Sequence, residues 1–321
     1  MDRINDQEKH TIMKRTIISS LLLLLALNIQ AQNEITIEGK VTNVEDGSMV
    51  RLFRWDGRVG IAIASDTIEN GNFYFKVEAV KELEKLSLSG LSSKFPSIGR
   101  ELFVTPGCHM SISGNGYKIL GWNVKSKVKE QQEYDFYMNA AREEYDALQD
   151  WLIQRNVYEK MLTSETATEE ERKIAKDKFN DVSFLTKCEF QLEGKKIEAM
   201  KDRPITSIWL DNLQQFSSSV NYYPDYPHRE KVFELYNRLS DEQKDSEIGK
   251  IITAQLFPPV VVKTGDEMFD ADLYDLEGNL HHLSELKGRY IPLDFWSSGC
   301  SPCINALPEM GEIAEKYKDK L

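Results

Sequence analysis

The sequence has few cysteines, no concentrated basic face and no apolar run long enough to span a bilayer. Four cysteines in 321 residues are too few for a disulfide scaffold. A net charge of −12 argues against nucleic acid as a partner, because proteins that bind it need clustered basic residues. The chain is 41 % hydrophobic, which is enough for ordinary cores, and its length favours two or three domains over one.

The N-terminus has the three-part pattern of a secretory signal peptide. The basic pair Lys14–Arg15 precedes an apolar run, Ile17–Leu27, and the small residue Ala31 follows. A membrane-spanning helix needs about 20 apolar residues, so a cleaved signal over residues 1–31 is favoured over an anchor. Because the first twelve residues are polar and acidic, translation from Met13 is a possible true start. We predict export to the periplasm or cell envelope, with no stable membrane anchor after cleavage.

The sequence pattern of residues 33–122 predicts a series of short strands. Apolar and polar residues alternate in runs such as Ile35–Val41 and Phe73–Val77, which is the period of a half-buried strand. The pairs Asp46–Gly47 and Asn70–Gly71 supply the positive φ that tight turns require. We therefore predict an N-terminal antiparallel β-sandwich, and we find no catalytic constellation in it.

The spacing of apolar residues changes after residue 122. One predicted helical face is made of residues three or four apart: Tyr134, Tyr137, Ala141, Tyr145, Leu148 and Leu152. We predict a second helix from about Glu169 to Lys201, with Cys188 in its core face, and shorter helices over residues 205–216 and 229–239. Residues 123–255 are thus a helical middle segment without recognisable chemistry.

The last region, residues 256–321, contains the chemistry-bearing motif. Two strands around a Glu277–Asn279 turn and an apolar strand, Tyr290–Trp296, are expected before a helix opened by Cys300-Ser301-Pro302-Cys303. The amide groups and dipole at a helix N-terminus favour a thiolate over a thiol. Cys300 is therefore the expected nucleophile in disulfide exchange, and Cys303, one turn further along, is the expected resolving thiol. Pro302 suits the first helical turn, where its missing amide hydrogen costs nothing.

The run from Asp294 to Cys303 resembles the active-site segment of thioredoxins, and the leader before it resembles exported TlpA-like thiol–disulfide oxidoreductases. These belong to the thioredoxin-like superfamily, in a grouping with alkyl hydroperoxide reductases and thiol-specific antioxidants. The resemblance covers about residues 256–321 and includes Trp296 and the helix-kinking Pro308. It implies an α/β domain with a redox-active disulfide between Cys300 and Cys303.

The same resemblance implies that Asp294 is a buried acid that assists proton transfer to the resolving thiol. It implies no cofactor and no metal. Its partners would be protein thiols and disulfides and an unidentified envelope electron donor. Gly299 departs from the family, which usually has a tryptophan there. Because the chain ends at Leu321, the expected domain is incomplete, and we expect impaired exchange activity.

Other interpretations of the cysteine pair remain open. It could form half of a zinc site with His281 and His282, or a structural disulfide. A peroxidase of the peroxiredoxin type needs Pro seven residues and Thr or Ser three residues before its reactive cysteine. Ser297 meets the second requirement, but Leu293 occupies the first position. A secreted binding or structural protein with a non-functional thioredoxin remnant is the alternative from another functional class.

Overall fold

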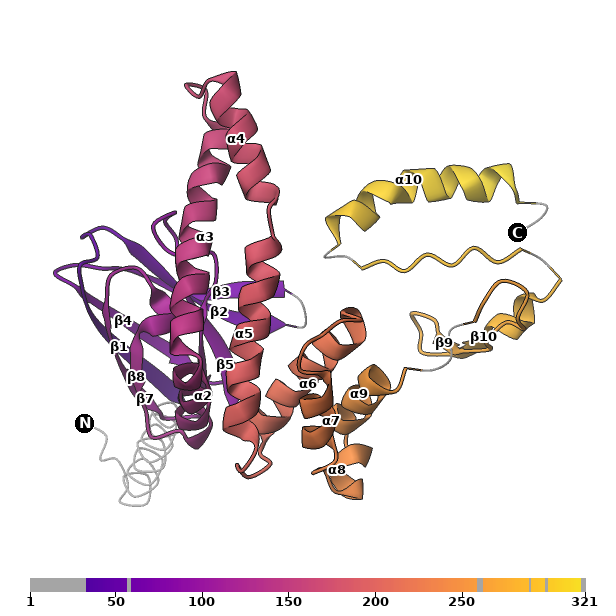
Figure 1. Cartoon of the computed structure of the whole chain (residues 1–321), viewed down its shortest axis with the longest axis horizontal. Helices are drawn as coiled ribbons and strands as arrows, with labels where there is room; N and C mark the ends of the chain where they lie inside the picture. Colours follow the sequence, from indigo (N-terminus) through magenta and orange to yellow (C-terminus); the bar gives the residue numbers. More distant parts are fainter. Residues whose placement is uncertain (1–32, 57–58, 259–261, 289, 298–299, 319–321) are drawn as a thin grey trace, which may run out of the picture. The chain divides into compact units, whose positions relative to one another are not determined.

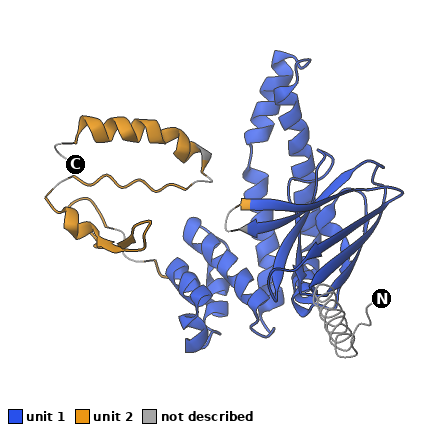
Figure 2. Ribbon diagram, turned by 180° about the vertical axis from the view of Figure 1, so that it is seen from behind, with its two compact units in different colours: residues 1–56, 60–256 blue, residues 57–59, 257–321 orange. Residues whose placement is uncertain are grey.

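The computed structural model describes residues 33–56, 59–258, 262–288, 290–297 and 300–318 (Figure 1). Two compact units divide the chain, one of residues 1–56 and 60–256 and the other of residues 57–59 and 257–321 (Figure 2). The predicted signal peptide lies outside the described residues. Across the described ranges, no helix is both long and apolar enough to cross a membrane.

Eight strands of the first unit form two four-stranded sheets, ordered β4-β1-β7-β8 and β3-β2-β5-β6. The strands are β1 (Glu34–Thr42), β2 (Met49–Asp56), β3 (Val59–Thr67), β4 (Asn72–Glu78), β5 (Glu84–Gly90), β6 (Arg100–Val104), β7 (His109–Asn115) and β8 (Asn123–Lys125). The predicted alternation is confirmed in β1 and β4. Ile35 and Ile37 of β1, and Phe73 and Phe75 of β4, are buried, while the residues between them are more exposed.

The prediction of an antiparallel arrangement is wrong for one strand pair. β1 and β7 run parallel, with Ile37 opposite Met110. A parallel pair cannot be joined by a tight hairpin, and here strands β2 to β6 lie between its two members along the chain. The first sheet is therefore mixed, because β1 also pairs antiparallel with β4.

Helices follow the strands in the first unit. They are α2 (Lys129–Ala140), α3 (Arg142–Thr163), α4 (Glu169–Asn180), α5 (Ser183–Met200), α6 (Ser207–Tyr222), α7 (Arg229–Tyr236), α8 (Asp241–Asp245) and α9 (Glu247–Leu256), with a short 3₁₀ helix at Ile119–Gly121. The single helix predicted from Glu169 to Lys201 is wrong, since α4 ends before α5 begins. At the break, the Asp181 carboxylate accepts hydrogen bonds from the amide and hydroxyl of Ser183. Such local bonds compete with the helical pattern of backbone hydrogen bonds.

Strands and helices of the first unit share one hydrophobic core. Ile37 and Phe75 of the sheet belong to the same buried cluster as Trp122, Trp209 and Phe216. Trp209 of α6 is fully buried, and its indole nitrogen donates a hydrogen bond to the Met200 carbonyl at 3.1 Å. The segments on either side of residue 122 therefore bury their apolar faces together.

The second unit contains a short hairpin and one long helix (Figure 2). β9 (Asp272–Tyr274) pairs antiparallel with β10 (Leu280–His282), which confirms the two strands predicted around the Glu277–Asn279 turn. The 3₁₀ helix Leu283–Leu286 follows, and α10 covers Ser301–Lys316. Leu283 is the one buried residue among the described residues of this unit.

The predicted strand Tyr290–Trp296 is absent from the structure. The described residues of this segment have no strand assignment, and neither β9 nor β10 pairs with them. An apolar sequence becomes a strand only where a neighbouring strand accepts and donates its backbone hydrogen bonds. Without such a neighbour the side chains are solvated, and Phe295 is 88 % exposed.

Candidate redox site

Cys300 is the N-cap residue of α10. Its backbone is extended, with φ −93° and ψ 92°, and its sulfur accepts a hydrogen bond from the Cys303 amide at 3.3 Å. A side-chain acceptor bonded to the third amide of a helix is the ordinary N-cap arrangement. The Cys300 sulfur therefore bonds an amide of the first helical turn, which has no partner among the backbone carbonyls of the helix.

The two cysteines of the motif are joined by a disulfide bond. Their Cα atoms lie 5.2 Å apart, and the sulfurs are bonded across one turn of the chain. Both residues are partly exposed, so reagents in solvent can reach the pair. Pro302 is exposed within the first turn of α10, where it removes one amide hydrogen that would otherwise lack an acceptor.

The surroundings of this disulfide favour a negative charge on sulfur. After reduction, the Cys303 amide and the positive end of the α10 dipole would both stabilise a thiolate at Cys300. Helix N-termini of this kind lower a cysteine pKa from about 8.5 into the range of about 3.5–7.5. The arrangement therefore favours a thiolate over a thiol at Cys300 once the disulfide is reduced.

The other residues singled out in the sequence lie in exposed positions. Asp294 is exposed, as is Trp296 at 54 %, and both belong to the extended segment before the motif. The structure does not bury Asp294 as the resemblance implies. Pro308 lies inside α10 and is exposed. Gly299, which stands where the family has a tryptophan, lies outside the described residues.

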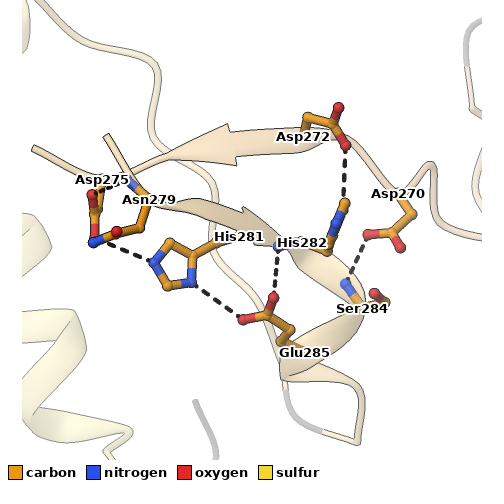
Figure 3. Close-up of polar contacts among 8 residues, drawn as sticks. All are labelled: Asp270, Asp272, Asp275, Asn279, His281, His282, Ser284 and Glu285. Atoms are coloured by element: carbon orange, nitrogen blue, oxygen red, sulfur yellow. Dashed lines mark hydrogen bonds and ion pairs between the residues drawn. The ribbon is translucent and has the colours of Figure 1, made fainter. Parts of the chain in front are cut away.

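The two histidines considered for zinc contact carboxylates of the hairpin and of the 3₁₀ helix after it (Figure 3). His281 lies between Asp275, at 3.4 Å from Nε2, and Glu285, at 3.3 Å from Nδ1. His282 Nδ1 is 3.3 Å from an Asp272 oxygen. No group of three or more candidate metal ligands occurs within the described ranges. With both sulfurs in a disulfide, the two histidines and the two cysteines do not act as one ligand set in this structure.

The sequence analysis missed the carboxylates that organise this hairpin. Asp275 accepts hydrogen bonds from the amide and the side chain of Asn279, which lower the pKa of its carboxyl group. The amide of His282 likewise lowers the pKa of Glu285. The sequence contained a signal for these contacts in the turn Asp275–Asn279. Gly278 has a positive φ, which brings the ends of the turn together, and an aspartate side chain at its start can then bond the asparagine at its end.

Comparison with known proteins gives partial matches to redox proteins. The chain is 39 % identical over 59 residues to the thiol-disulfide oxidoreductase ResA of Bacillus thuringiensis (strain Al Hakam), covering 18 % of this chain and 34 % of that protein. It is 34 % identical over 88 residues to ResA of Bacillus cereus (strain ATCC 10987 / NRS 248), covering 27 % and 42 %. It is 34 % identical over 62 residues to the thioredoxin-like protein YneN of Bacillus subtilis (strain 168), covering 19 % and 36 %.

The chain is similar to thioredoxin-like thiol–disulfide oxidoreductases. It spans about a third to two fifths of the length of these relatives. No family model matches the chain, and no solved structure matches it significantly. The names of these relatives describe thiol-disulfide oxidoreductases and a thioredoxin-like protein.

Proposed function

We propose that this protein catalyses thiol–disulfide exchange through Cys300 and Cys303. The observation that carries the proposal is the position of the disulfide at the start of α10, with the Cys303 amide directed at the Cys300 sulfur. Two further observations support it: the partial matches to thiol–disulfide oxidoreductases, and the thioredoxin-like sequence from Asp294 to Cys303.

The reaction needs both sulfurs in turn. In the reduced protein, the Cys300 thiolate attacks one sulfur of a substrate disulfide, forms a mixed disulfide and releases the other substrate sulfur as a thiolate. The Cys303 thiol then loses its proton and attacks the Cys300 sulfur, which releases the second substrate thiolate. Two electrons pass to the substrate, the released thiolates take up protons, and the protein is left with the Cys300–Cys303 disulfide. A thiol reductant must then reduce that bond.

We place this reaction outside the cytoplasm, in the cell envelope, as in exported TlpA-like proteins. The support is the basic and apolar N-terminal segment before Ala31. The substrates are then protein thiols or disulfides, and the electron donor is an envelope thiol. Asp294 remains the predicted proton-transfer group of the second step.

The experiment is a mixed-disulfide trap with glutathione disulfide as the probe. The reduced full chain is mixed with the probe, and the products are mapped by mass spectrometry. Cys303→Ser should retain glutathione on Cys300, because no resolving thiol remains, whereas the wild-type protein should return to its internal disulfide. Cys300→Ser should react at least about tenfold more slowly, since Cys303 lacks the N-cap position.

Cys108→Ser is the matched control. Cys108 is a partly exposed free cysteine, and burial raises the pKa of its thiol. Its replacement should leave the rate and the position of glutathione addition unchanged. Equal addition to Cys300 and Cys303 in the two serine variants would contradict the assigned roles, and addition mainly to Cys108 would contradict the proposed site.

A further inference from the structure

The first unit contains a cavity that the redox chemistry does not use. Its volume is about 580 Å³, and it is bounded by α3, α5 and α6 together with the residues before β6. Helix α5 packs against both α3 and α6 (Figure 1). Sites for small molecules have volumes of about 300–1,000 Å³. The cavity is therefore large enough for an organic ligand.

The charged side chains that line this cavity are mostly carboxylates. Three of them are Glu101, Glu189 and Glu193, and the one ammonium group among the described lining residues belongs to Lys196. On α5, Glu189, Glu193 and Lys196 follow each other at positions i, i+4 and i+7, which is the spacing of a single helix face. Three acidic groups against one basic group favour a cationic ligand.

The Glu193 carboxylate and the Lys196 ammonium group are already engaged with protein groups. Glu193 is buried, and it accepts hydrogen bonds from Ser219 at 2.9 Å and from Tyr226 at 2.6 Å. Burial raises the pKa of Glu193, and the two hydroxyls and the charge of Lys196 lower it. Lys196 also lies over the Tyr145 ring, with 5.9 Å between its nitrogen and the ring centroid. These two charges therefore act on each other and need no ligand.

Glu189 is the lining carboxylate that lacks such a partner. It forms no hydrogen bond or ion pair with any residue that the structure describes, whereas Glu101 pairs with Lys85 at 3.2 Å. Burial raises the pKa of Glu189, and no cation or hydrogen-bond donor among the described residues offsets this effect. The residue is half-buried, but its oxygens are not enclosed by protein. A molecule in the cavity can therefore reach them.

Two tyrosine rings form an aromatic corner in the wall of the same cavity. Tyr222, the last residue of α6, and Tyr223 have ring centroids 4.8 Å apart and ring planes at 79° to each other. Phe190 packs edge-on against Tyr223 at 5.0 Å and supports it. Tyr222 is 76 % exposed, so its ring is open to a ligand, whereas the Tyr134 ring already has Arg100 over it at 5.6 Å. The faces of aromatic rings attract cations.

We propose that this cavity binds a small organic ammonium ion with an apolar body, and that Glu189 pairs with its ammonium group. The rings of Tyr222 and Tyr223 would face the cation, and apolar side chains of the wall such as Leu192 would cover the body. The ligand would supply the cation that Glu189 lacks within the protein. Lys196 opposes it by like-charge repulsion, but the lining carboxylates outnumber this one ammonium group.

The test is isothermal titration calorimetry of the full chain with tryptamine and with phenethylamine near neutral pH. Their matched probes are tryptophol and 2-phenylethanol, which keep the aromatic body and replace the ammonium group by a neutral hydroxyl. We expect each amine that binds to bind at least about tenfold more tightly than its alcohol, as a charge-assisted contact requires. Glu189→Gln should reduce this difference to about twofold or less.

Glu143→Gln is the matched protein variant. Glu143 lies on α3, which also bounds the cavity, but it is exposed and does not line it. Its replacement removes the same charge and should leave the affinity of the amines within about twofold of wild type. Tyr222→Leu should weaken amine binding several-fold and alcohol binding less. Because Tyr222 is exposed, this variant keeps the proposal testable if Glu189→Gln does not fold.

Three results would overturn the proposal. One is no binding of either amine at about 1 mM or below. The second is equal affinity for amine and alcohol in the wild-type protein. The third is a loss of amine binding that is the same in Glu143→Gln as in Glu189→Gln. Cys300→Ser should bind the amines as wild type does, which separates this site from the redox reaction.

Discussion

Replacing Gln131 by leucine should destabilise the first unit far more than its position on one helix suggests. Gln131 of α2 is fully buried, and its side-chain oxygen accepts a hydrogen bond from the Phe103 amide at 2.7 Å. β6, which contains Phe103, is the last strand of its sheet. The side-chain nitrogen donates to Asp135 at 2.9 Å, and the Asp135 carboxylate also pairs with Arg100 of β6. One amide side chain therefore joins the edge of a sheet to a helix.

The expected cost is about 3 kcal/mol. A buried amide left without an acceptor costs about 1–3 kcal/mol, and a lost hydrogen bond to a charged group costs about 1.5–3 kcal/mol. The leucine recovers part of this sum by burying apolar surface, at about 25 cal/mol per Å². For a unit of this size, 1 kcal/mol corresponds to about 2–4 °C in the midpoint of thermal unfolding. The midpoint should therefore fall by about 6–12 °C.

The assay is thermal unfolding combined with amide hydrogen exchange. The control is Gln132→Leu, the same change at the next residue, whose side chain is exposed and bonds the Ser126 carbonyl. Gln131→Leu should also speed exchange at the Phe103 amide specifically. If the two leucine variants differ by less than about 0.5 kcal/mol, the edge of the sheet does not depend on this side chain and the reasoning is wrong.

Two further predictions concern exposed groups. Thr168→Ala should remove the capping box in which Thr168 and Glu171 bond each other's amides. Amide hydrogen exchange in α4 should then become faster, by an amount equivalent to about 1 kcal/mol of lost helix stability. Unchanged exchange in α4 would contradict this prediction. Hydrogen bonds from Lys201 and Lys231 lower the pKa of Glu198 to about 2, so Lys231→Met should move it toward 4.5 in an NMR titration. Because the folded pKa is the lower one, this exposed cluster adds a small stability above pH 4.5 that disappears as the pH falls toward 2.

The sequence predicted which residues of a strand face the core better than it predicted which strands pair with each other. The alternation in β1 and β4 could be read directly, because a strand has period two whatever lies beside it. The parallel pairing of β1 with β7 could not be predicted, since it depends on residues that are 73 positions apart, such as Thr36 and His109. The change from strands to helices near residue 122 was predicted to separate two domains, and this domain boundary stays a prediction. In the structure, Trp122 and Trp209 share one core across it.

In the candidate site too, local features could be predicted from the sequence, whereas long-range packing could not. Cys300 and the start of α10 could be predicted, because an N-cap and the turn after it depend on neighbouring residues only. The exposure of Asp294 could not be predicted from the segment alone, because burial requires strands packed on both sides of it. In the structure Asp294 and Trp296 are exposed, and no strand assigned among the described residues pairs with the segment that contains them.

Polar residues on apolar helix faces mark some of the places where local sequence rules fail, and Gln131 and Lys196 are two of them. Gln131 shares the face of α2 with Tyr134 and Met138 by its spacing, and Lys196 shares the face of α5 with Leu192. The sequence shows both anomalies but not their partners. In the structure Gln131 has two hydrogen-bond partners, whereas Lys196 lies over the Tyr145 ring and its charge acts on the Glu193 carboxylate. Gln131→Leu should therefore lower the free energy of unfolding by about 3 kcal/mol, whereas Lys196→Met, which keeps most of the buried apolar stem, should lower it by less. If Lys196→Met destabilises the protein as strongly as Gln131→Leu, the Lys196 ammonium contributes as much to the fold as the two hydrogen bonds of Gln131, and this reasoning is wrong.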